Sequence, residues 1–214
     1  MPADAAFDLN CRRCPRLAAF LDQVGRDHPD YHARPVPPFG DPYARLLIVG
    51  LAPGLHGANA TGRPFTGDFA GILLYQTLFE TGFSNQSEST HRDDGLQLRD
   101  CRITNAVKCL PPQNKPVGAE IRNCNAYLQR ELPQDGAGRV ILALGRIAHE
   151  SVLRAYALKL REHPFGHAAE HRLPNACTLL DSYHCSRYNT QTRRLTPTMF
   201  QAVFARAREL LEAA

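Results

Sequence analysis

The chain has 214 residues, of which 43% are hydrophobic and 21% charged, and its formal net charge at pH 7 is +4. This composition excludes a largely disordered chain, and no apolar stretch approaches the roughly 20 residues that a membrane-spanning helix needs. The length suits one domain over residues 1–214, and the mild basic charge permits a polyanionic partner without requiring one.

The N-terminal segment MPADAAFDLN contains acidic residues and lacks the apolar core of an export signal. We therefore expect a cytoplasmic protein. Seven cysteines in such a chain favour metal ligands or buried thiols over a framework of disulfides.

Apolar spacing along the chain predicts helices that alternate with short strands. In chain order, the pattern predicts a helix over 15–26, an irregular connector over 28–42, a strand over 46–49, a helix over 69–82, a polar surface segment over 84–100, a short apolar segment within 101–109, a loop over 110–116, a helix over 117–132, a strand over 140–144, a helix over 146–157, a strand over 178–180 and a helix over 198–211. This alternation predicts an α/β fold, a three-layer α/β/α sandwich around a mostly parallel sheet.

The strand over 46–49 and the loop that follows it organise the chain. The strand is an unbroken apolar run, which is typical of a strand buried on both faces of a parallel sheet. The loop over 51–68 is rich in glycine, which allows a ligand to approach the backbone closely, and it carries Phe65 and Asp68. Loops over 108–116 and 181–196 also follow predicted apolar segments. Because parallel strands end at one edge of a sheet, we expect all three loops to meet there.

Four of the cysteines fall into two pairs. Cys11 and Cys14 form a C-x2-C pair, and Cys109 and Cys124 form a second pair. Four thiolates suit zinc or an iron–sulfur cluster, and neighbouring basic residues favour the thiolate form. The alternative is that the pairs are incidental core thiols, which is our interpretation of Cys101 and Cys177.

Three segments resemble a known family. GLAPGLHGANATGRPFTGD, NAVKCLPPQNKP and DSYHCSRYNTQTRRLT resemble, in order, the motifs of the iron–sulfur uracil-DNA glycosylases. Within that superfamily the resemblance is to family 5 (type B), because Leu51 stands where family 4 has Glu and Asp68 follows RPFTG. It covers nearly the whole chain and implies a monomer with a [4Fe–4S] cluster on Cys11, Cys14, Cys109 and Cys124.

The resemblance also implies base excision repair, in which the N-glycosidic bond of a base flipped out of DNA is hydrolysed and an abasic site is left. Phe65 would stack on the base, unless it is only a core residue. Asn105 would read the imide edge of uracil with its amide, unless it is a cap or turn residue.

Two further residues receive catalytic roles from the resemblance. Asp68 would position water and balance an oxocarbenium-like sugar, and its alternative role is to cap the helix that begins near residue 69. His184 would donate a hydrogen bond towards the departing base anion or orient the flipped nucleotide.

Small residues after the first strand imply a roomy substrate pocket. The substrate-binding residues implied are Gly50, Ala52, Pro53, Gly54, Phe65 and Asn105. We expect such a pocket to accept hypoxanthine and xanthine as well as uracil.

The third segment implies contacts with DNA. The residues concerned are Ser186, Arg187, Tyr188, Asn189, Gln191 and Thr192, for which a solvated turn is the alternative. Cys185, Tyr188 and Arg193 depart from the residues usual in the family, and Tyr188 is a candidate for the wedge that enters the base stack.

Two rival functions are compatible with the residues. A non-catalytic DNA-binding module with a structural zinc is the stronger rival. A nucleotide-binding enzyme is the weaker, because GLAPG is neither G-x-G-x-x-G nor a P-loop.

Overall fold

The computed structural model describes residues 7–213, so the first six residues of the segment tested for an export signal lie outside the described part. Its centre is a six-stranded sheet in the order β1-β3-β2-β4-β6-β5. The strands are β1 (Phe39–Gly40), β2 (Leu46–Gly50), β3 (Cys101–Asn105), β4 (Val140–Leu144), β5 (Glu170–Arg172) and β6 (Thr178–Ser182). The helices are α1 (Pro15–Asp27), α2 (Ala58–Thr61), α3 (Phe69–Glu80), α4 (Gly118–Glu131), α5 (Arg146–Ala155), α6 (Arg187–Gln191) and α7 (Pro197–Glu212), with 3-10 turns η2 (Pro112–Asn114) and η3 (Leu160–Glu162).

The four inner strands, β3, β2, β4 and β6, run parallel, and the two edge strands are antiparallel to their neighbours. Every residue of the inner strands is buried, as expected for parallel strands with helices on both faces. The predicted α/β fold with a mostly parallel sheet is therefore confirmed.

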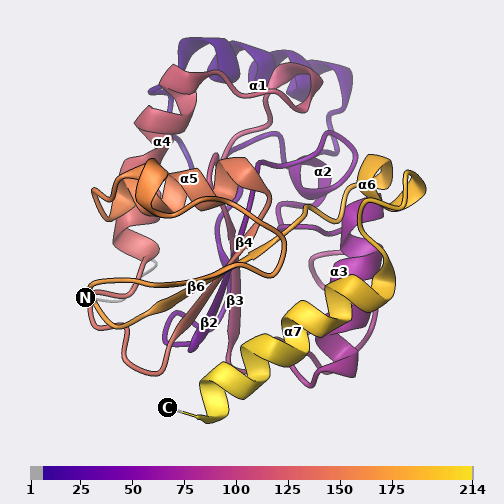
Figure 1. Ribbon diagram of the computed structural model, residues 1–214. Coiled ribbons are helices and arrows are strands. Elements are labelled where there is room, and N and C mark those ends of the chain that lie inside the picture. The colour runs from indigo at the N-terminus through magenta and orange to yellow at the C-terminus, as the bar shows by residue number, and fades with distance from the viewer. Residues whose placement is uncertain (1–6, 214) are drawn as a thin grey trace.

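Alternate residues of the strands supply two separate cores. Leu46 and Ile48 of β2 pack with α3 and α7, whereas Leu47 and Val49 pack with α4 and α5. Figure 1 shows the same arrangement, with α3 and α7 on one side of the sheet and α4 and α5 on the other. The period of two in a strand thus produces the three layers.

Four short elements were not predicted. The edge strands β1 and β5 have two and three residues, and the helices α2 and α6 have four and five. None is long enough to show an apolar period, so their formation depends on neighbours in space. The third predicted strand is also two residues longer than expected, because Asp181 and Ser182 continue β6.

The segment over 84–100 is more than a surface excursion. Ser84 and Leu96 are buried, and Ser84 forms an antiparallel bridge with Leu98. Before this segment, α3 ends two residues earlier than predicted, and Gly82 follows with φ +76°, a conformation that favours glycine just after a helix. Within the described part of the chain, no helix is both long enough and apolar enough to cross a membrane.

Candidate functional site

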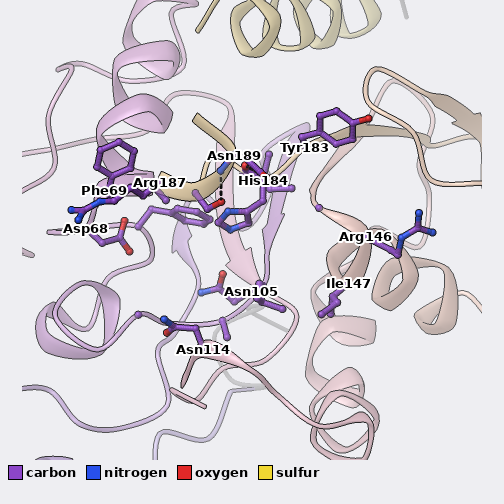
Figure 2. A pocket seen from close by; sticks show the side chains of 18 of the residues that line it. Asp68, Phe69, Asn105, Asn114, Arg146, Ile147, Tyr183, His184, Arg187 and Asn189 are labelled. Atoms are coloured by element: carbon purple, nitrogen blue, oxygen red, sulfur yellow. Dashed lines mark hydrogen bonds between the residues drawn. The ribbon is translucent and has the colours of Figure 1, made fainter. Parts of the chain in front are cut away.

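A cavity of about 630 Å³ lies at the carboxyl ends of the parallel strands. Leu51 follows β2, Asn105 ends β3, Leu144 ends β4 and Tyr183 follows β6, and all four line the cavity. The predicted meeting of distant loops at one sheet edge is therefore observed. Figure 2 shows the cavity with its lining side chains.

The Asn105 amide is buried, with 3% of the residue exposed, and it faces the cavity (Figure 2). Its Oδ1 has no hydrogen-bond partner among the described residues. Gly50, its neighbour on β2, makes room for it, because a Cβ there would contact Asn105 Oδ1 and would lie 2.6 Å from Phe65 Cζ. A buried acceptor without a partner is costly, so this atom is available for a ligand.

The Phe65 ring forms a second wall of the cavity. Its backbone has φ +54°, which is unusual for a side chain of this size, and the ring packs both on the core and beside His184, with centroids 6.0 Å apart and planes at 30°. The Tyr75 hydroxyl donates to the Pro64 carbonyl over 2.7 Å and anchors the residue before Phe65. Phe65 is therefore a core residue that also lines the cavity, and its stacking on a base stays a prediction.

A buried arginine holds the loop that carries Phe65. Arg63 is paired with Asp94 at 2.6 Å and donates to Thr66 Oγ1 and Ser89 Oγ at 2.9 and 2.7 Å. Burial opposes ionisation of Asp94, but Arg63 and backbone N–H groups outweigh it and hold the Asp94 pKa below its usual value. The segment over 84–100 thus holds the loop over 51–68 in place through the contacts of Asp94 and Ser89 with Arg63.

Asp68 caps α3 and also lines the cavity. Its Oδ1 accepts from the Gly71 N–H over 2.8 Å, which matches the predicted cap. Burial raises the pKa of this carboxyl, although the N–H groups of Gly71 and Ala70 act in the opposite direction. Gly57 lies against the carboxylate, since a Cβ at that position would be 2.6 Å from Asp68 Oδ2.

His184 is half-buried beside Phe65, and burial lowers its pKa to about 4. The ring is therefore neutral near pH 7. Its backbone carbonyl accepts from Asn189 Nδ2 over 2.8 Å, the dashed line in Figure 2. Phe65, Asp68, Asn105 and His184 consequently meet in one cavity, as the sequence predicts.

The other implied site residues divide between the cavity and its surroundings. The structure places Ala52, Gly54, Ser186, Arg187 and Asn189 in the cavity wall. The remaining ones, Gly50, Pro53, Tyr188, Gln191 and Thr192, are not part of that wall. Tyr188, Gln191 and Thr192 are exposed on or just after α6, and Ser186 caps this helix by accepting from the Asn189 N–H at 3.4 Å.

Part of the cavity wall was not predicted. It is formed by Gly145, Arg146, Ile147 and Phe165, beside Tyr183 and Arg194 of the predicted loop over 181–196, for which no role was predicted. Gly145 follows a buried parallel strand, so the rule that located the other loops also points to it. Phe165, in contrast, belongs to a connector without a recognisable pattern.

A buried histidine and aspartate support this wall. His149 Nδ1 lies 2.8 Å from Asp181 Oδ1, and His149 Nε2 lies 2.9 Å from the His163 carbonyl oxygen. These contacts tie α5 and β6 to the connector that carries Phe165. His171 completes a compact group with His149 and Asp181.

The four paired cysteines come together away from the cavity. Cys11, Cys14, Cys109 and Cys124 line one small apolar void between α1 and α4. Burial, together with the three neighbouring sulfurs, raises the pKa of the Cys109 thiol to about 12.

Two N–H groups point at these sulfurs. Lys108 donates its backbone N–H to Cys124 Sγ over 3.2 Å, and Asn123 Nδ2 lies 3.6 Å from Cys14 Sγ. Four thiols with N–H donors in an apolar surrounding fit a thiolate-bound metal centre. Cys101 and Cys177 are instead buried residues of the two main cores, as predicted.

The uracil DNA glycosylase superfamily model matches residues 37–208 of the chain. The chain is 50% identical over 205 residues to the type-5 uracil-DNA glycosylase of Thermus thermophilus, covering 94% of this chain and 93% of that protein. It is 40% identical over 203 residues to the type-5 uracil-DNA glycosylase of Pyrobaculum aerophilum, covering 93% and 88%. It is 42% identical over 210 residues to that of Mycobacterium tuberculosis, covering 94% and 78%.

Proposed function

The chain is an enzyme that belongs to the uracil DNA glycosylase superfamily, and we propose that it hydrolyses the N-glycosidic bond of uracil in DNA after base flipping. The observation that carries this proposal is the cavity in which an aromatic ring, an amide with a free acceptor and a carboxylate face one another. The product is an abasic site, so the enzyme would begin base excision repair.

Recognition of the flipped base follows from Phe65 and Asn105. The Phe65 ring would stack on the base, and its position is already fixed by the core. The amide of Asn105 offers one acceptor and one donor group in a plane, which matches the N–H and carbonyl of the uracil imide edge. Both side chains are held before substrate arrives, so little ordering is needed on binding.

Bond cleavage follows from Asp68 and His184. Departure of the base leaves positive charge on the sugar and negative charge on the base. The Asp68 carboxylate would stabilise the sugar cation and position the attacking water. The neutral His184 ring would donate an N–H to the base anion, in a site whose dipoles are already oriented.

DNA would be held by the loop that contains α6. Ser186, Arg187, Asn189, Gln191 and Thr192 would contact phosphates or the gap left by the base. Tyr188, which is 70% exposed, would enter the base stack as a wedge.

The substrate range would extend to hypoxanthine and xanthine. A cavity of about 630 Å³ with Ala52 and Gly54 in its wall supports room for a purine. The test is release of hypoxanthine from a duplex that is otherwise identical to the uracil duplex. Uracil release without hypoxanthine release, opposite each of the four bases, would reject the wider range.

Cys11, Cys14, Cys109 and Cys124 would hold a [4Fe–4S] cluster. When bound, the cluster supplies a structural cross-link between the segment before α1 and the α4 region, and no catalytic step depends on it. We also infer one domain for the whole chain, a monomer and a cytoplasmic location.

The enzymatic proposal is tested with a duplex that contains one uracil. The unsubstituted protein should be brown and release uracil, and Asp68→Ala should lose about 100-fold or more of the rate while it still binds the duplex. A colourless protein that binds DNA and never releases uracil would instead support the zinc-containing binding module.

A further inference from the structure

Three arginines line the cavity, and each lies over an aromatic ring that also lines it. The distances from guanidinium carbon to ring centroid are 5.3 Å for Arg146 over Phe165, 5.0 Å for Arg187 over Phe69 and 4.6 Å for Arg194 over Tyr183. All three arginines are exposed, whereas the three rings are half-buried. The rings therefore serve as fixed supports for the guanidinium groups.

None of these three guanidinium groups has a carboxylate or hydrogen-bond partner within residues 7–213. Arg63 and Arg154, by contrast, are paired with Asp94 and Glu150. A guanidinium that stacks on a ring keeps its N–H donors free, and those donors match the oxygens of a phosphate. The cavity therefore carries three guanidinium groups that no carboxylate of residues 7–213 pairs with.

The arginines stand on different sides of the cavity. Figure 2 shows Arg187 beside Phe69 and Asp68, and shows Arg146 and Tyr183, the support of Arg194, on the other side. This spacing suits a strand whose backbone passes across the mouth and presents a phosphate on each side of one inserted nucleotide.

Arg146 is also a cation at the N-terminus of a helix, where anionic side chains are preferred. It is the first residue of α5, its cap Gly145 offers no side chain, and the first turn contains no acidic residue. A cation at a helix N-terminus is unfavourable unless an anion is near, because the helix dipole is positive there. Bound phosphate would remove this conflict.

We propose that Arg146 and Arg194 form, opposite Arg187, a clamp for the phosphates that flank the flipped nucleotide. The inference rests on the proposed function and assigns two residues that the motifs leave without a role. The clamp positions the strand, and its charge makes DNA binding dependent on salt concentration.

The test measures affinity for a duplex with one uncleavable deoxyuridine analogue at several KCl concentrations. The logarithm of the association constant falls as log[KCl] rises. In each of Arg146→Gln and Arg194→Gln the slope of this fall should be less steep, by about 0.9, which is the value for one lost phosphate contact. Arg146→Lys should restore most of that slope, because it returns the charge. Arg154→Gln is the matched control, since Arg154 lies on the same helix and is paired with Glu150 at 2.8 Å, and its slope should not change.

If Arg146→Gln or Arg194→Gln shows the same salt dependence as Arg154→Gln, the clamp is overturned. Uracil release by the unsubstituted protein is measured in parallel. If uracil is released and the glutamine variants have the salt dependence of the unsubstituted protein, the clamp alone is overturned. If the variants have a weaker salt dependence but no uracil is released, the clamp is retained and the enzymatic proposal is rejected.

Discussion

The loop over 51–68 and the loop over 183–196 border the same cavity, but they are held in opposite ways. In the first, Arg63, Phe65 and Thr66 are buried and braced from behind by the segment over 84–100. In the second, Cys185 and Leu195 are buried, but no residue of α6 between them is. The contacts of α6 include the Ser186 cap, the bond from Asn189 to the His184 carbonyl, the bond from the Leu195 N–H to the Asn189 carbonyl and the Arg187–Phe69 stacking.

The difference separates two tasks. Groups that act on a reacting base must be in place before the reaction, because reorganisation during catalysis costs rate. Groups that grip a large polyanion can remain exposed, since the partner covers them on binding. The comparison predicts that substitutions in the first loop damage the folded enzyme or its reacting groups, whereas those in α6 affect only its handling of DNA.

The largest effect is expected for Arg63→Ala. Removal of this side chain leaves the Asp94 carboxylate without its cation and removes the hydrogen bonds to Thr66 and Ser89, so the free energy of unfolding should fall by about 3–5 kcal/mol. Urea unfolding measures it. The control is Arg12→Ala, which breaks an exposed pair with Asp22 and should leave the free energy of unfolding nearly unchanged. Equal losses in both variants would contradict the view that the first loop is braced.

Gly57→Ala should disable the site without unfolding the chain. The new methyl group would lie 2.6 Å from Asp68 Oδ2, so the carboxylate must move. Because small displacements at a reacting centre are expensive, uracil release should slow on the order of 100-fold. Gly25→Ala is the control, since its Cβ would meet only Ala33 Cβ at 3.5 Å. Release at the parental rate in Gly57→Ala would show that the position of Asp68 is not critical.

A smaller effect is expected from His184 as pH changes. Its folded pKa of about 4 lies below the ordinary value of 6.5, so the unfolded chain takes up the proton first as pH falls. Stability should therefore decrease from pH 6.5 down to about 4, and this part of the decrease should be on the order of 1–2 kcal/mol.

His184→Gln should remove that part of the pH dependence while Asp68 and the rest of the chain stay unchanged. The measurement is urea unfolding of parent and variant at several pH values. Parallel curves for the two proteins would show that His184 does not resist protonation in the folded state.

The smallest effect on stability is expected in the second loop. Tyr188→Ser changes an exposed ring and should alter the free energy of unfolding by less than about 0.5 kcal/mol. Uracil release from duplex DNA should nevertheless fall roughly tenfold, and release from a single strand should not, because only the duplex requires unstacking.

Tyr43→Ser is the matched control for that substitution. Tyr43 is 71% exposed, close to the 70% of Tyr188, but it precedes β2, at the end of the sheet away from the cavity. Both release rates should be unaffected in this variant. A fall in duplex activity as large as that of Tyr188→Ser would show that loss of a surface ring, rather than of a wedge, is responsible.

Local pattern was sufficient for much of the fold. The strands β2 and β4 are unbroken apolar runs, and α1, α4 and α7 have clear helical periods, because a buried face imposes its spacing on consecutive residues. The rule for parallel strand ends then places Phe65, Asp68, Asn105 and His184 together, and the structure agrees.

Other features depend on contacts between distant residues, which leave no period in the chain. The edge strands β1 and β5 exist only because β3 and β6 offer hydrogen bonds. Arg63 reaches Asp94 across 31 positions, and Phe165 enters the cavity wall from a connector without a motif. The sequence by itself determined the layers and the chemistry of the site, since both follow from residue type and spacing. Only the tertiary structure decided how the site is braced and where its arginines stand, because ion pairs and ring contacts form wherever folding brings side chains within reach.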